Sequence, residues 1–125
     1  MSWQTLIAIG SGGFLGAISR AYINALFAKE FGTAFPYSTL FVNVVGSFFI
    51  GFLLSLFNNI QIDTHVKSFL TTGFLGALTT FSTFSIETYF LLEINILNGI
   101  LNIVLNLIGS IVAAIIGLKV VNLIF

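Results

Sequence analysis

Residues 96–118 read ILNGILNIVLNLIGSIVAAIIGL and contain no charged side chain. A helix needs roughly 20 mostly apolar residues to cross the hydrocarbon core of a bilayer, which is about 30 Å thick. This stretch is long enough and apolar enough, and it predicts a membrane-spanning helix that ends near Lys119. The rest of the chain should then also be suited to a protein that is embedded in a lipid bilayer.

The composition agrees with a membrane location. Only 6% of the 125 residues are charged, whereas 58% are hydrophobic and 15% aromatic. Ordinary soluble domains carry about 25% charged residues, so a water-facing surface built from this chain would expose large apolar patches. The net charge is zero and no basic cluster occurs, which argues against a nucleic-acid partner because phosphate binding needs several Lys or Arg contacts.

Three further apolar stretches of similar length precede the first one, at residues 3–28, 38–57 and 66–92. Short polar segments separate them, and the most polar of these, residues 58–67, is expected to be a loop in water. The sequence therefore predicts an all-α membrane protein in which residues 1–125 form a single domain of four transmembrane helices.

The positive charges are balanced between the two faces of the membrane. With four spans, Lys67 and Lys119 lie on one side while Arg20 and Lys29 lie on the other. Membrane proteins are oriented by an excess of Lys and Arg on the cytoplasmic side, and two against two gives no excess. We therefore predict weak or dual orientation.

Polar side chains recur at helical spacing in two of the predicted spans. The last span carries Asn98, Asn102, Asn106 and Ser110, and the second carries Thr39, Asn43, Gly46 and Ser47. Amides in hydrocarbon are costly unless they face protein or water, so both stripes are expected to face inward. They are compatible with hydrogen bonds that hold helices together or with a polar path for a solute. Neither stripe contains the Asp, Glu or His relay typical of proton-coupled transporters.

The third span is unusual in its middle, where residues 73–85 read GFLGALTTFSTFS. Glycine, threonine and serine are weak helix formers, so we predict a local break near Gly76 to Thr80. Phe81 and Phe84 are three residues apart and fall on one helix face, either as packing groups or as part of a site. The ionisable groups inside the predicted spans are Arg20, near an interface, and Glu87.

Motifs of enzymes do not occur in the sequence. No phosphate-binding loop, nucleophile elbow or metal constellation is found, cysteine is absent and His65 is the one histidine. We therefore predict that the protein is not an enzyme. Small residues at four-residue spacing, Gly12 with Gly16 and Gly109 with Ala113, favour close approach of helices.

Three stretches together resemble the Fluc (CrcB-type) fluoride channels. They are residues 13–20 (GFLGAISR), 39–48 (TLFVNVVGSF) and 73–87 (GFLGALTTFSTFSIE). The resemblance implies an antiparallel, dual-topology homodimer in the cell inner membrane with two narrow pores. It also implies passive export of fluoride down its electrochemical gradient, which lowers cytoplasmic fluoride.

The resemblance also assigns roles to single residues. It implies fluoride-conducting pores lined by Asn, hydroxyl and phenyl groups, namely Asn43, Phe81, Phe84, Ser82, Thr83 and Ser110. It implies a vestibule that contains Arg20 and Glu87. Backbone carbonyls at Gly76 and Thr79 are expected to hold a structural sodium ion at the dimer interface. Asn102 and Asn106 extend the polar stripe by periodicity alone.

Two other classes of protein share parts of this pattern. A small multidrug exporter has the same short, four-span, dual-topology layout, but it depends on a membrane glutamate in its first helix, and residues 3–28 contain none. A non-transporting assembly subunit would use every polar stripe as contact between helices. Ion flux through the purified protein distinguishes a channel from such a subunit.

Overall fold

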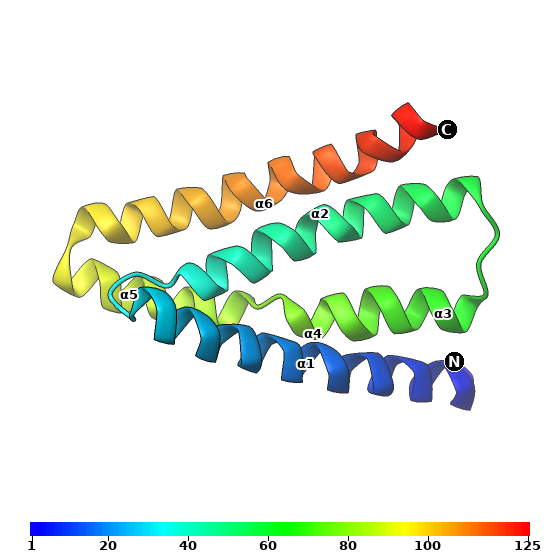
Figure 1. Cartoon of the computed structure of the whole chain (residues 1–125), viewed down its shortest axis with the longest axis horizontal. Helices are drawn as coiled ribbons and strands as arrows, with labels where there is room; N and C mark the ends of the chain where they lie inside the picture. The colour runs from blue at the N-terminus through cyan, green and yellow to red at the C-terminus, as the bar shows by residue number, and fades with distance from the viewer.

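The computed structural model describes all residues from 1 to 125 and is entirely helical (Figure 1). Four long helical segments run back and forth, and each is long and apolar enough to cross a membrane. The helices are α1 (Trp3–Phe31), α2 (Tyr37–Asn59), α3 (Thr64–Ser68), the π-helix η1 (Phe69–Leu75), α4 (Gly76–Leu78), α5 (Phe81–Ile94) and α6 (Ile96–Ile124). The expected four-span, all-α architecture is confirmed.

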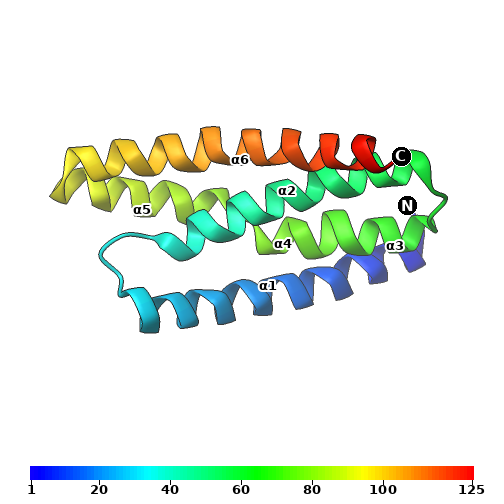
Figure 2. The same cartoon turned by 45° about the horizontal axis from the view of Figure 1, so that its top comes forward.

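Both chain termini and the loop between α2 and α3 lie at one end of the bundle (Figures 1 and 2). The connection between α1 and α2 and the turn between α5 and α6 lie at the other end. In both views α6 lies beside α2, and α1 lies beside the first half of the third span. The connections between the four spans therefore lie at the two ends of the bundle.

All four spans extend beyond the ranges expected from sequence, and the C-terminal extensions of α1 and α6 are the longest at any one end. α1 continues past Ala28 to Phe31 and ends where Gly32 adopts φ 75°, a conformation that favours glycine. α6 continues past Leu118 to Ile124. Lys29 and Lys119 are exposed, so each charge stays at the surface while the backbone continues its helical hydrogen bonding. A single charged residue marks the polar interface rather than the end of a helix.

The third span is irregular in two places. Its residues Phe69–Leu75 form a π-helix, which sequence did not predict. Between α4 and α5, the backbones of Thr79 (ψ 156°) and Thr80 (φ −151°, ψ 124°) are extended. Helical hydrogen bonding stops there, and the Thr80 hydroxyl caps α5 by accepting a hydrogen bond from the Thr83 N–H at 3.2 Å.

Glycines allow the closest approach between helices. A Cβ atom at Gly51 would clash with the Ala114 carbonyl of α6, and one at Gly117 would clash with the Phe48 carbonyl of α2. α1 packs in the same way on the π-helix, because a Cβ at Gly12 would clash with the Phe69 carbonyl. Backbones in contact gain dispersion energy that side chains would otherwise prevent.

The interior is small and partly polar. Val42, Leu75 and Leu78 form the apolar cluster at its centre, while Asn102 (0% exposed) and Asn106 (3%) are among its most buried side chains. Large apolar side chains such as Ile108 and Ile111 point outward. This arrangement is the reverse of a soluble domain, and it confirms that the polar stripe of the last span faces inward.

Candidate functional site

Asn43 of α2 binds the interruption between α4 and α5. Its Oδ1 accepts a hydrogen bond from the Thr80 N–H at 2.8 Å, and its Nδ2 donates to the Thr80 carbonyl at 3.0 Å. The second Nδ2 hydrogen donates to Asn106 Oδ1 on α6 at 2.9 Å. The two polar stripes therefore meet at Asn43, and both of its N–H groups have partners.

A pocket of about 260 Å³, which we call the phenylalanine pocket, lies beside this junction. Side chains from α2, α5 and α6 and the residues between α4 and α5 surround it: Asn43, Ser47, Thr79, Thr80, Phe81, Phe84, Asn106, Leu107, Ser110 and Ile111. It brings together four of the six residues that the resemblance assigns to the pore, namely Asn43, Phe81, Phe84 and Ser110, from three separate segments of the chain.

The two phenylalanines of this pocket differ in exposure. Their rings are 5.4 Å apart between centroids and inclined at 64°, so the edge of one ring faces the other ring. Phe84 is 6% exposed, whereas Phe81 is 71% exposed. Phe84 therefore packs within this chain, while Phe81 presents its ring to whatever adjoins the bundle.

Ser110 supplies a hydroxyl without a partner to the same pocket. Its Oγ is buried and makes no hydrogen bond. Buried polar groups are almost always paired, because an unpaired one costs about 1–3 kcal/mol. A hydroxyl donates one hydrogen bond, so the pocket offers a free donor next to the edges of aromatic rings, which carry partial positive charge.

A second pocket, of about 290 Å³, adjoins the first at Thr80 and is called here the arginine pocket. Arg20, Asn24, Thr39, Thr83 and Glu87 are among its lining residues. The Arg20 Nε–H donates to the Ala77 carbonyl near the end of α4 at 3.0 Å. This bond holds Nε of the guanidinium against the third span, close to its interruption.

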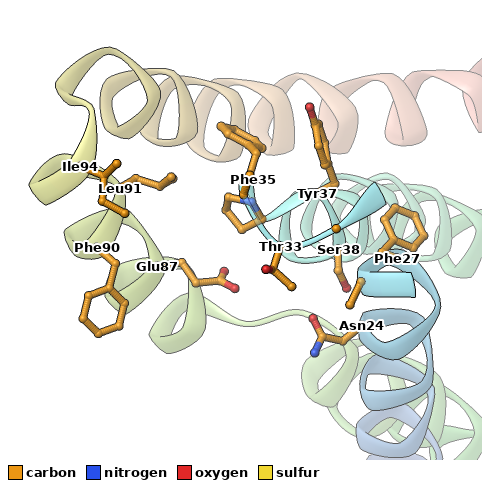
Figure 3. Close-up of a pocket in the computed structure, with 14 residues that line it drawn as sticks. Asn24, Phe27, Thr33, Phe35, Tyr37, Ser38, Glu87, Phe90, Leu91 and Ile94 are labelled. Carbon is orange, nitrogen blue, oxygen red and sulfur yellow. The ribbon is translucent and has the colours of Figure 1, made fainter. Parts of the chain in front are cut away.

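Glu87 faces both the arginine pocket and a third pocket of about 200 Å³ at the end of the bundle (Figure 3). Its carboxylate points into this third pocket, toward Thr33 of the α1–α2 connection and toward Asn24 of α1 (Figure 3). The Oε1 atom is buried without a hydrogen-bond partner. Asn24, Ser38 and Glu87 line both pockets, so the polar space continues toward the end of the bundle.

The remaining predicted residues lie around this space. Thr83 lines the arginine pocket, not the one that holds the phenylalanines. Ser82 is exposed, lines neither pocket, and lies 3.5 Å from the Thr80 hydroxyl. Thr79 lines the phenylalanine pocket, whereas Gly76 is exposed at the surface of the single chain.

Thr80 and Asn24 were not predicted as site residues from the sequence, although Thr80 was expected to lie at the break in the third span. Thr80 takes part in both pockets and is held at its N–H and its carbonyl. Thr80 lies between a glycine-containing half and a hydroxyl-rich half of one span, and this position could have pointed to it. Asn24 lies one helical turn after Arg20, and that spacing on a polar face could have pointed to it.

Four apolar spans surrounding a polar interior define the chain as a multi-pass protein of the plasma membrane. The family model for the CrcB-like protein, Camphor Resistance (CrcB), matches residues 7–118. The chain belongs to this CrcB family.

Similar proteins carry a more specific name. A protein of Sulfurimonas denitrificans named "Fluoride-specific ion channel FluC" is 55% identical over 94 residues, which cover 74% of this chain and 73% of the relative. A protein of the same name from Campylobacter fetus is 57% identical over the same shares of both chains. One from Campylobacter jejuni is 50% identical over 90 residues, or 72% of this chain and 74% of the relative. These relatives are named as ion channels, not as enzymes.

Proposed function

We propose that this chain is a fluoride-selective ion channel that exports fluoride passively down its electrochemical gradient. The names of its relatives support the substrate. The structural observation that carries the proposal is the phenylalanine pocket, where the unpaired Ser110 hydroxyl lies among the lining residues Phe81 and Phe84. The pocket contains no fixed charge, so it offers donors without a group that would trap an anion.

The chemistry of the pocket suits a small, strongly hydrated anion. Fluoride that leaves water needs replacement donors, and a conducting site has to bind it weakly enough to release it. The Ser110 hydroxyl and the ring edges of Phe81 and Phe84 supply such donors. Asn43 has no free N–H in the single chain, so an ion that reaches this amide has to replace Thr80 or Asn106 as its acceptor.

The vestibule of the channel corresponds to the arginine pocket. The Arg20 guanidinium places a permanent positive charge there, and a charge in a low-dielectric cleft raises the local concentration of counter-ions. The pocket continues past Glu87 to the end of the bundle (Figure 3). An anion would therefore enter from this end and meet Thr83 and Thr80 on its way to the phenylalanines.

We assign the working form as an antiparallel homodimer with two pores. The exposed ring of Phe81 supports this assignment, because one face of the phenylalanine pocket has no wall in the single chain. The balance of Lys and Arg between the two ends favours insertion in both orientations. Two oppositely inserted copies would close each other's pockets.

A sodium ion at the dimer interface fits the donor chemistry near Gly76. The Thr80 N–H would bond the Gly76 carbonyl in an uninterrupted helix, but it donates to Asn43 Oδ1 instead. The Gly76 carbonyl is thus released on an exposed surface next to Thr79, and carbonyl oxygens are ligands that hard cations prefer. The ion would supply positive charge that stabilises the pairing of two copies.

Passive conduction is sufficient for export of this ion. Hydrogen fluoride is a weak acid that crosses membranes uncharged and ionises inside the cell. A negative internal potential then drives fluoride outward, at about 2.3 kcal/mol per charge for each 100 mV. A channel without nucleotide or proton coupling therefore lowers cytoplasmic fluoride.

Reconstitution tests the proposal directly. Purified protein in liposomes loaded with potassium fluoride should release fluoride to an electrode when valinomycin is added, and liposomes loaded with potassium chloride should retain their anion. Release of both anions at similar rates would refute selectivity. No release of either anion, from protein that remains folded and dimeric, would indicate a non-transporting subunit.

A further inference from the structure

A chain of hydrogen bonds begins and ends at the third span and passes through α2 and α6 on the way. The Thr80 N–H donates to Asn43, Asn43 donates to Asn106 Oδ1, and Asn106 donates to Asn102 Oδ1 at 3.0 Å. Asn102 then donates to the Thr88 hydroxyl at 2.9 Å. Finally, the Thr88 hydroxyl donates to the Phe84 carbonyl at 2.7 Å.

Each group in this chain accepts from the one before it and donates to the one after it. Hydrogen bonds in such a series polarise and strengthen one another. The side chains of Asn102, Asn106 and Thr88 are buried, so water does not compete with them. One end of the series holds Thr80 and the other holds the backbone of Phe84.

The inner members of the series touch Asn43 only through one atom. Asn106 Oδ1 accepts from Asn43, while Asn106 Nδ2 donates to both the carbonyl and the Oδ1 of Asn102. These two donated bonds fix the direction of the Asn106 amide, because its oxygen is then directed at Asn43. Asn43 in turn is oriented with its own oxygen toward Thr80.

We infer that Asn102, Asn106 and Thr88 are positioning residues for ion conduction, which they control by setting the orientation of the Asn43 amide. This inference rests on the proposed channel function. Asn102 and Thr88 line none of the pockets described above, so they act through Asn106 and Asn43 rather than on the ion. The alternative is that these hydrogen bonds only hold the helices together. In that case the loss of any hydrogen bond between α2 and α6 should lower ion conduction to a similar extent.

The chain offers a matched control for that alternative. Asn122 of α6 accepts a hydrogen bond from the Ser55 hydroxyl of α2 at 3.3 Å, far along the same helix pair. Asn106→Leu and Asn122→Leu each remove one α2–α6 hydrogen bond at similar side-chain volume. Asn106→Leu should lower fluoride release from liposomes by about tenfold or more. Removing the hydrogen-bond partner of a metal ligand has an effect of this size at metal sites. Asn122→Leu should leave release within about twofold of the unmodified protein.

A double-mutant cycle tests whether Asn106 acts through Asn43. In the background of Asn43→Ser, the added Asn106→Leu change should lower release by less than about twofold, because the amide that Asn106 orients is already gone. If the fold-change of the double variant equals the product of the two single fold-changes, the two residues act independently and the inference is overturned. A positional role also predicts an altered ratio of fluoride to chloride release, which simple destabilisation of the bundle does not change.

Thr88→Val provides a milder variant if Asn106→Leu does not fold. It removes the hydroxyl that accepts from Asn102 and keeps the shape of the side chain. Release should fall by about threefold to tenfold. Thermal unfolding in detergent should shift only by what the loss of one buried hydrogen bond explains, because Asn102 Nδ2 loses its acceptor. Release equal to that of the unmodified protein would overturn the inference, whereas a silent unmodified protein would instead refute the proposed channel function.

Discussion

The side-chain amide of Asn43 forms two hydrogen bonds with the backbone of Thr80, one with its N–H and one with its carbonyl. A helix that stops inside a membrane leaves backbone groups that hydrocarbon cannot satisfy. Here one side-chain amide satisfies the two groups that the interruption leaves at Thr80. The irregular backbone is therefore stabilised at Thr80, because a neighbouring helix supplies partners for both of its backbone groups.

Replacing Asn43 with leucine should destabilise the protein markedly. The change keeps the volume but leaves the N–H and carbonyl of Thr80, and Oδ1 of Asn106, without this partner. An unpaired buried group costs about 1–3 kcal/mol, so we expect the free energy of unfolding to fall by about 2–4 kcal/mol. Thermal or denaturant unfolding in detergent measures it. Asn59→Leu is the control, because Asn59 is exposed and bonds only to Ser55 of its own helix; similar losses at both sites would contradict the argument.

Phe81→Ile and Phe84→Ile should both impair fluoride release from liposomes, because isoleucine has no positive ring edge. They should differ in stability. Phe84 is buried and its truncation should cost about 1–3 kcal/mol, whereas exposed Phe81 should cost much less in the single chain. Phe49→Ile on α2 is the control, since Phe49 is exposed and lines none of the pockets. Unchanged release from either test variant would show that its ring does not line the pathway.

Gly117→Ala should weaken the contact between α2 and α6. The added methyl group would clash with the Phe48 carbonyl, so the helices would have to separate. Overpacking of this kind costs about 1–3 kcal/mol. Gly10→Ala is the matched control, because nothing lies within 4 Å of the new Cβ and alanine favours helix. The first change should lower the melting temperature and the second should keep or raise it; the reverse order would refute the packing account.

Arg20→Gln should lower fluoride release by about tenfold at low ionic strength, through loss of the charge that concentrates anions. The deficit should shrink at high salt, where such fields are screened. Arg20→Lys retains the charge and should restore most of the release, although it loses the bond from Nε to the Ala77 carbonyl. Lys119→Gln, which removes an exposed charge from α6, should have little effect. A deficit independent of salt would point to the hydrogen bond instead of the charge.

The variant Ser2→Cys should react with a membrane-impermeant thiol reagent from both sides of the membrane. The chain has no cysteine of its own, so the labelling is unambiguous. Equal populations of the two orientations predict about half of the total labelling from each side in sealed vesicles. Labelling from one side alone would refute dual insertion and the antiparallel dimer with it.

Much of the fold could be predicted from the sequence because lipid imposes simple rules. The charge-free run of residues 96–118 is too long and too apolar for anything except a span, and the spacing of Asn102 and Asn106 determines which face is buried. The π-helix could not be predicted, and it lies where Gly12 of α1 packs closely against Phe69. Periodicity within one helix does not contain that tertiary contact.

The candidate site was predictable only in part for a similar reason. The resemblance to the family assigned Asn43, Phe81, Phe84 and Ser110 to the pore, and the structure gathers these four around one pocket. Helical spacing could not assign Thr83 to the arginine pocket instead, because the extended backbone just before α5 determines which way that helix faces. The bonds that hold Thr80 join residues far apart in sequence, and no local pattern encodes them.

The π-helix at Phe69–Leu75 lets this segment tolerate the loss of one residue. A π-turn accommodates more residues than the α-turn it replaces, whereas each residue turns a regular α-helix by about 100°. Loss of one residue here would let the segment relax into an ordinary α-helix, and the residues that follow, including Thr80, which Asn43 binds, would keep nearly the same rotation about the helix axis. The same deletion within the regular helix α5 would instead change the phase of every residue after it.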